Sequence, residues 1–114
     1  MKIIVIYCIY IRYYSILYII FMSKNIITYK LIILGKVQGV GYRYWFYKLA
    51  KSKNINGYVK NTKDHKVISI IQGSEKKILD MIELSKKGPI NSNVENIRIK
   101  KLLNIKKYKE FSID

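Results

Sequence analysis

The sequence predicts one α+β domain of the split βαβ type, in which two helices lie on one face of an antiparallel sheet. Its length of 114 residues suits a single domain. Hydrophobic residues make up 50% of the chain and charged residues 25%, as in globular proteins. Beyond residue 21, segments with strand and helix patterns alternate in the order β-α-β-β-α-β, followed by a short last strand.

The first strand and the first helix follow from residue type and spacing. Residues 26–34 are rich in β-branched and aromatic side chains, which favour a strand. Three glycines within residues 35–41 end this strand and predict a loop. Residues 42–53 predict a helix that Asn54 closes in the left-handed conformation. The apolar stripe of this helix consists of Trp45, Phe46, Leu49 and Ala50.

A hairpin and two closing strands complete the predicted sheet. Residues 57–62 and 66–72 have the pattern of short strands, joined by a turn at residues 63–65. Residues 93–103 and 109–113 predict the closing strands. We therefore expect four strands and a short fifth one.

The second helix is predicted between the hairpin and the closing strands. Ser74 is suited to cap its N-terminus, and Glu75 places a negative charge in its first turn. The pair Gly88-Pro89 ends it. We expect its apolar face to consist of Ile78, Leu79, Met81 and Ile82.

Residues 1–21 form a separate hydrophobic extension, and we place the domain itself at residues 22–114. The extension carries two charges, Lys2 and Arg12, and is long enough to cross a bilayer as a helix. However, Arg12 lies near its middle, and its five tyrosines prefer the membrane interface. Three interpretations stay open: a misassigned or dispensable start, a membrane anchor or signal, and a genuine structural element. Cys8 lies within the extension, and we assign it no chemical role.

The net charge of +15 is by itself a weak sign of nucleic-acid binding. Lysine supplies 19 of the 22 basic residues, and Lys, Ile, Asn and Tyr are all encoded by AT-rich codons. We therefore expect no specific nucleic-acid partner, and only adhesion to anionic polymers at low salt. One cysteine and one histidine exclude an internal disulfide framework and a zinc site built from these two residue types.

The loop at residues 35–43 is the strongest functional feature of the sequence. Gly39 and Gly41 can adopt positive φ, which turns successive backbone N–H groups toward a common anion. The N-terminus of the following helix adds a partial positive charge. Arg43 offers a planar fork for phosphate oxygens in a chain that has three arginines. A tight strand-to-helix turn followed by a solvated arginine explains the same residues equally well.

Four ordered motifs resemble the pattern of the acylphosphatase family. Residues 35–43, GKVQGVGYR, are similar to its signature loop, and residues 57–61, GYVKN, to its second signature. Gly88-Pro89 and the Phe-Ser-Ile run at residues 111–113 also match at the expected relative positions. The resemblance covers about residues 27–114 and implies a ferredoxin-like fold.

The resemblance also implies an activity and roles for individual residues. The chain would be a cytoplasmic acid-anhydride hydrolase that converts an acyl phosphate to a carboxylate and inorganic phosphate without metal or cofactor. Asn61 would orient the attacking water. Phosphate would be product and competitive inhibitor, and the enzyme a monomer that meets a membrane only if residues 1–21 are an anchor. The implied phosphate-binding residues are Gln38, Gly39, Val40, Gly41, Tyr42 and Arg43.

Three residues depart from the family pattern, and none of them is Arg43 or Asn61. Tyr42 stands where phenylalanine is usual, Asn54 where glycine is common, and His65 in a hairpin turn where Asp-Gly is usual. The alternative function is a non-catalytic ferredoxin-like module that binds RNA or an anionic ligand, although the central strands lack the aromatic motifs of RNA-recognition domains. A third interpretation is the acylphosphatase-like part of a larger carbamoyl-transfer maturation protein, for which a chain of 114 residues leaves little room.

Overall fold

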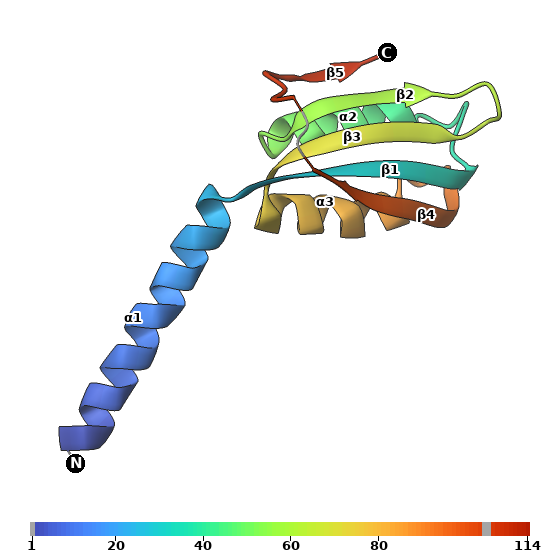
Figure 1. Ribbon diagram of the computed structural model, residues 1–114. Helices are drawn as coiled ribbons and strands as arrows, with labels where there is room; N and C mark the ends of the chain where they lie inside the picture. The colour runs from blue at the N-terminus through green and yellow to red at the C-terminus, as the bar shows by residue number, and fades with distance from the viewer. Residues whose placement is uncertain (1, 104–105) are drawn as a thin grey trace.

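The computed structural model describes residues 2–103 and 106–114 and, within the N-terminal helix, the side chains of Ile6 and of residues 8–18. Its elements follow the predicted order β-α-β-β-α-β after an N-terminal helix (Figure 1). The helices are α1 (Lys2–Lys24), α2 (Tyr42–Ser52) and α3 (Glu75–Lys87). The strands are β1 (Ile26–Lys36), β2 (Asn56–Asn61), β3 (Val67–Ser74), β4 (Asn93–Leu102) and β5 (Phe111–Ile113).

The five strands form one sheet in the order β4-β1-β3-β2-β5. β1 pairs antiparallel with β3 and β4, and β3 pairs antiparallel with β2. The α+β sandwich is confirmed, but β5 lies parallel to β2, so the sheet is mixed rather than purely antiparallel. The reason is topological. β4 runs antiparallel to β2, so a strand that returns along the far edge of β2 must run parallel to it.

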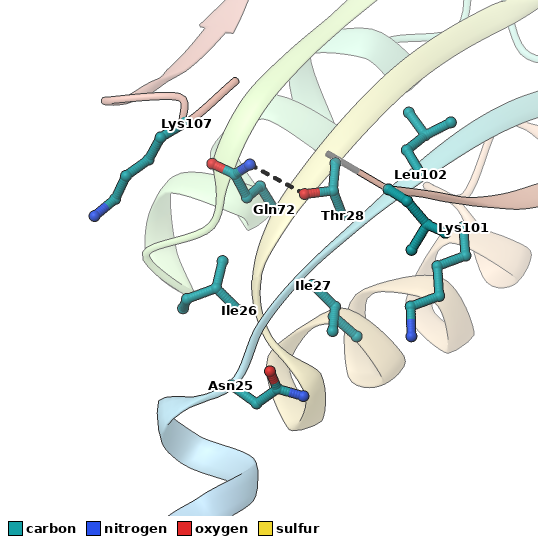
Figure 2. A pocket seen from close by; sticks show the side chains of 9 residues that line it. Asn25, Ile26, Ile27, Thr28, Gln72, Lys101, Leu102 and Lys107 are labelled. Atoms are coloured by element: carbon teal, nitrogen blue, oxygen red, sulfur yellow. Dashed lines mark hydrogen bonds between the residues drawn. The ribbon is translucent and has the colours of Figure 1, made fainter. Parts of the chain in front are cut away.

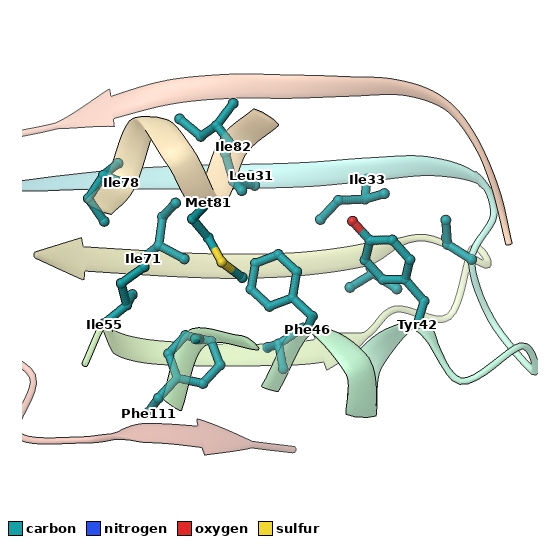
Figure 3. Packing of buried hydrophobic residues seen from close by; sticks show 14 of the residues in the cluster. Leu31, Ile33, Tyr42, Phe46, Ile55, Ile71, Ile78, Met81, Ile82 and Phe111 are labelled. Atoms are coloured by element: carbon teal, nitrogen blue, oxygen red, sulfur yellow. The ribbon is translucent and has the colours of Figure 1, made fainter. Parts of the chain in front are cut away.

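The core lies between the sheet and the two helices α2 and α3, which pack on one of its faces (Figures 1 and 3). Alternate residues of β1, including the fully buried Leu31 and Ile33, point toward the helices. Phe46 of α2 lies at the centre of this layer, with its ring 6.0 Å from that of Phe111 in β5. Each such buried side chain contributes about 1.5–3 kcal/mol to folding. Because β1 and α2 both contribute core residues, the core fixes the two elements that flank the loop between them.

Helix α3 corrects one detail of the predicted core. Ile78, Met81 and Ile82 are buried as expected, whereas Leu79 is 46% exposed. Successive helical positions are turned by about 100°, so Leu79 points away from the face that its neighbours share. Ser85 takes the remaining buried position, and its hydroxyl donates to the Met81 carbonyl oxygen at 2.6 Å. Ser74 is the N-cap residue as predicted, but its side chain makes no capping hydrogen bond.

Tyr42, the departure from the family's phenylalanine, has a structural role. Its ring is buried among the core side chains (Figure 3). Its hydroxyl donates to the Ser85 carbonyl oxygen at 2.7 Å. That carbonyl lies in the last turn of α3, where the donor four residues on would be Pro89, which has no N–H. Burial raises the pKa of the Tyr42 hydroxyl, so it stays a neutral donor. Tyr42 therefore joins the start of α2 to the end of α3.

Tyr42→Phe should lower the free energy of unfolding by about 1–2 kcal/mol, because the Ser85 carbonyl oxygen loses its partner in a buried place. Tyr44→Phe, at a side chain that is 60% exposed, is the matched control and should change nothing. Urea unfolding of the three proteins measures both effects. Equal stability of Tyr42→Phe and the wild type would show that this hydrogen bond contributes nothing.

Two non-glycine residues have left-handed backbone conformations. Asn54 has φ 55° after α2, which confirms its predicted role of closing that helix. His65 has φ 65° in the turn between β2 and β3, where the family pattern has glycine. Its backbone thus keeps the turn shape at the cost of a conformation that residues with a Cβ rarely adopt.

Helix α1 extends away from the sheet, and it contacts α3 and β3 (Figure 1). Every side chain from residue 8 to residue 18 is exposed, and the run includes large apolar residues such as Ile9 and Leu17. Among the residues that the structure describes, no helix is both long enough and apolar enough to span a membrane. No described side chain of α1 belongs to the hydrophobic core.

We propose that residues 22–114 fold without the extension. Removal of residues 1–21 should leave one cooperative unfolding transition with an unchanged midpoint, because the core lies downstream of α1. Calorimetry of the full-length and shortened chains measures this. A shortened chain without a cooperative transition would make α1 part of the folding unit.

Candidate active site

The loop between β1 and α2 is shaped by two glycines with left-handed backbone angles. Gly39 has φ 72° and Gly41 has φ 79°. An added Cβ would have open space at either position, so the backbone angle alone favours glycine there. Gly41 is the N-cap residue of α2 and has no side chain with which to cap the helix. The first N–H groups of α2 are therefore available to an anion.

A pocket of about 300 Å³ lies at this loop. It brings together both glycines, Arg43 from the first turn of α2, and Asn61 from the end of β2. Val40 alone of the sequence-predicted site residues is not part of the lining, and its side chain packs against the core instead. The complete lining is Val37, Gln38, Gly39, Gly41, Tyr42, Arg43, Tyr44, Asn61 and Ile113.

Arg43 is held by the C-terminal strand segment. Its Nη1 donates to the main-chain oxygen of Asp114 at 2.5 Å, and the Asp114 N–H donates to the Val59 carbonyl oxygen. The parallel pairing of β5 with β2 thus places residues 113–114 beside the pocket. Sequence reasoning missed this contact, because a parallel pairing between distant segments leaves no local pattern.

Gln38 joins the loop to the hairpin that follows β2. Its Nε2 donates to the carbonyl oxygens of Thr62 and Lys66, at 2.8 and 2.7 Å. Both donors of its side-chain amide are therefore used within the protein, and what Gln38 offers to a ligand is its backbone N–H. Because Thr62 directly follows Asn61, these two bonds fix the loop relative to Asn61.

Gln38→Leu should lower the free energy of unfolding by about 1–3 kcal/mol and weaken phosphate binding, because two carbonyl oxygens lose a donor and the loop loses its tie. Asn91→Ala, at an exposed residue after α3, is the control and should alter neither quantity. Urea unfolding and calorimetric titration with inorganic phosphate measure the two effects. Unchanged phosphate affinity in Gln38→Leu would show that the loop holds its shape without the tie.

The hairpin beside the pocket has its own network of polar contacts. Hydrogen bonds from the Lys66 ammonium group and the Thr62 hydroxyl lower the pKa of Asp64 to about 2. The Thr62 N–H donates to the Lys66 carbonyl oxygen at 2.9 Å and closes the turn. The carboxylate is thus used within the turn.

The pocket is electropositive in its polar groups. Arg43 and the N-terminus of α2 supply positive charge, and Asn61 supplies a neutral amide. Of the described residues that line it, none is Asp, Glu or His. The arrangement can therefore bind an anion and orient a neutral molecule beside it, but its lining has no side chain suited to proton transfer at neutral pH.

Two larger pockets, of about 480 and 420 Å³, lie at the other end of the strands. Both include Gln72, whose Nε2 donates to the Thr28 hydroxyl at 3.0 Å (Figure 2). Gln72 also donates to the Lys106 carbonyl oxygen and accepts from the Tyr108 N–H. Its amide is fully used in bonds to Thr28 and to residues 106–108, so size alone does not make these pockets the better candidates.

Comparison with known proteins gives a consistent result. The family model described as Acylphosphatase matches residues 29–113. An acylphosphatase of Azorhizobium caulinodans is 39% identical over 70 residues, covering 61% of this chain and 75% of that protein. An acylphosphatase of Bacillus pumilus is 33% identical over 87 residues, covering 76% and 97%. The crystal structure of acylphosphatase from Bacillus subtilis matches with a TM-score of 0.75 and 32% identity, over 77% of this chain and 98% of that one.

Proposed function

The chain belongs to the acylphosphatase family and is an enzyme of this type, and from this premise we propose how its residues divide the work. Arg43 and the backbone N–H groups of residues 38–43 bind the phosphate of an acyl phosphate, and Asn61 orients the attacking water. The observation that carries the proposal is the pocket that unites Arg43, Asn61 and the two left-handed glycines.

Phosphate binding rests on the loop, the helix and the guanidinium group. The left-handed angles at Gly39 and Gly41 favour a concave run of N–H groups, and the first turn of α2 continues it. The bond from Arg43 Nη1 to Asp114 uses one edge of the guanidinium group and leaves its other N–H donors for phosphate oxygens. The same bond limits the rotation of the side chain, so less conformational entropy is lost on binding.

Asn61 suits the orientation of water because it is neutral. A phosphate group that already carries negative charge repels a carboxylate, whereas an amide can accept from water and donate to it without that repulsion. Asn61 ends β2, and the Gln38 tie holds the loop against the next residue. The sheet therefore positions the Asn61 amide, and the loop positions the bound phosphate. Because the loop is tied to the residue after Asn61, the relative geometry of the two is fixed.

The bond changes need little from the protein. The water oxygen bonds to phosphorus, the bond between phosphorus and the carboxyl oxygen breaks, and its electron pair leaves with the carboxylate. A proton of the water passes to a phosphate oxygen. Because a carboxylate is a weak base, it departs without protonation, and no general acid is required. Positioning and charge stabilisation are the main contributions in phosphoryl transfer, and this pocket has groups for both.

Hydrolysis of benzoyl phosphate in excess chelator tests the proposal. We expect turnover that the chelator leaves unchanged, and competitive inhibition by inorganic phosphate with an inhibition constant equal to its directly measured dissociation constant. Binding of phosphate without hydrolysis would instead support the alternative, a non-catalytic module for an anionic ligand. The pocket is formed within one chain, so we also propose that the monomer is active. A hydrolysis rate that rises more than in proportion to protein concentration would contradict this.

A further inference from the structure

The sheet face opposite α2 and α3 is not covered by a helix within the described residues (Figure 1). Residues alternate between the two faces along each strand, so Lys30 lies on the face opposite Leu31. We use the name open face for this surface and consider six of its basic and aromatic residues: Lys30 in β1, Tyr58 and Lys60 in β2, Arg98 and Lys100 in β4, and Tyr108.

The strand register collects positive charge on the open face. Lys30 lies directly opposite Lys100, and Arg98 lies on the same face two residues from Lys100. Lys60 lies on the same face at the far side of β3. Among the described positions of this face that the strand register pairs, none is Asp or Glu; Glu95 lies at the bulge of β4, and the Asp114 carboxylate lies near Tyr58. Like charges directly opposite in a sheet are destabilising, so an anionic partner would relieve a repulsion that the free protein tolerates.

Two tyrosines lie beside these cations. The rings of Tyr58 and Tyr108 meet edge to face, with their centroids 6.2 Å apart. Lys60 Nζ lies 5.5 Å from the Tyr58 ring, and Lys106 Nζ lies 5.0 Å from the Tyr108 ring. Lys60 and Lys106 thus lie beside aromatic rings, and Ile70 of β3 separates this group from Lys30. Surfaces that bind unpaired bases and their phosphates combine the same two kinds of group.

Tyr108 is held on this face by specific hydrogen bonds. Its N–H donates to Gln72 Oε1 at 2.8 Å, and its carbonyl oxygen accepts from Asn56 Nδ2 at 3.1 Å. Gln72 is itself buried and bonded to Thr28 (Figure 2). The aromatic part of the face is thus ordered before any partner arrives, which reduces the entropy lost on binding.

We propose that the open face binds single-stranded nucleic acid without sequence preference, with phosphates at Lys30, Lys60, Arg98 and Lys100 and bases stacked on Tyr58 and Tyr108. Charge complementarity supports this occupant over a second copy of the chain, which would bring the same positive charges to the contact. The rings support it over a polyanion without bases. None of these residues lines the pocket with Arg43, so the two sites are separate.

The first test removes charge. Fluorescence anisotropy of a labelled twelve-residue oligouridylate with the full chain, over a range of salt, compares Arg98→Gln/Lys100→Gln with the control Lys76→Gln/Lys87→Gln on α3. The open-face variant should bind about tenfold more weakly at low salt, and its log–log salt slope should be smaller by about 1.4. The control should stay close to the wild type, and benzoyl phosphate hydrolysis should be unchanged in both. An equal loss in the control would overturn the proposal, because it would mean diffuse attraction to the whole lysine-rich surface.

The second test removes a ring and keeps the charge. Tyr58→Leu should weaken oligouridylate binding about tenfold with an unchanged salt slope, because it removes a stacking surface. Polyphosphate of equal charge should bind more weakly than oligouridylate to the wild type, and Tyr58→Leu should not alter its affinity. Polyphosphate binding as tight as RNA binding, or no effect of Tyr58→Leu on RNA, would reduce the open face to a simple cationic surface and overturn the proposal.

Discussion

Arg43→Lys should lower the turnover of benzoyl phosphate by about 10²–10³-fold, which corresponds to roughly 2–4 kcal/mol of lost transition-state stabilisation. Lysine keeps the positive charge but lacks the planar fork that can contact two phosphate oxygens at once. In this structure the guanidinium group also needs one edge for the Asp114 main-chain oxygen, which a single ammonium group could satisfy only at the expense of the phosphate. Phosphate inhibition should weaken in the variant as well.

Arg98→Lys is the matched control, since it makes the same replacement on β4, outside the pocket. Its kinetics should equal those of the wild type. Thermal unfolding of both variants should stay close to the wild type, because Arg43 is not part of the hydrophobic core. Steady-state kinetics and a melt of each protein separate the outcomes. Wild-type turnover in Arg43→Lys would mean that Arg43 is a solvated residue after a tight turn.

Asn61→Ala should have the second-largest effect, a loss of turnover on the order of 10²-fold with little change in phosphate affinity. The side chain is assigned to water and not to the anion, so its removal misplaces the nucleophile and leaves the phosphate cradle intact. Asn61→Asp keeps the shape but adds a negative charge, and it should lower both turnover and phosphate affinity.

Asn93→Ala is the control for this series, because Asn93 is an exposed strand residue outside the pocket. The inhibition constant of inorganic phosphate and the turnover number are measured for all four proteins. A loss of phosphate affinity in Asn61→Ala as large as its loss of turnover would move Asn61 into the phosphate-binding set.

The elements of the fold were predictable because their signals are local. The apolar spacing of α3 and the glycines after β1 act within a few residues, and the structure has the corresponding helix and loop. The burial of Ser85 in place of Leu79 was missed, since four apolar residues close in sequence do not all fit on one helix face. Tyr42 departs from the family pattern in the sequence itself, but its partner at the end of α3 depends on tertiary packing.

In the candidate site too, the local features could be predicted and the long-range contacts could not. Arg43 and Asn61 stand out by residue type and by resemblance, and the fold places both at one pocket. The tie from Gln38 and the contact between Arg43 and Asp114 join segments that are far apart in the sequence. Such pairings depend on strand order and register, which no local pattern determines. They explain how the site is held rigid, which the motif alone leaves open.

Phosphate binding at residues 38–43 is measured most directly by a titration of the ¹⁵N-labelled protein with inorganic phosphate, followed through its backbone amide signals. We expect the largest shifts at residues 38–43, with a single dissociation constant equal to the competitive inhibition constant. In Arg43→Lys the same signals should shift at higher phosphate concentrations. Shifts centred on the open face or on the pockets near Gln72, with residues 38–43 unaffected, would contradict the assignment of this loop as the phosphate site.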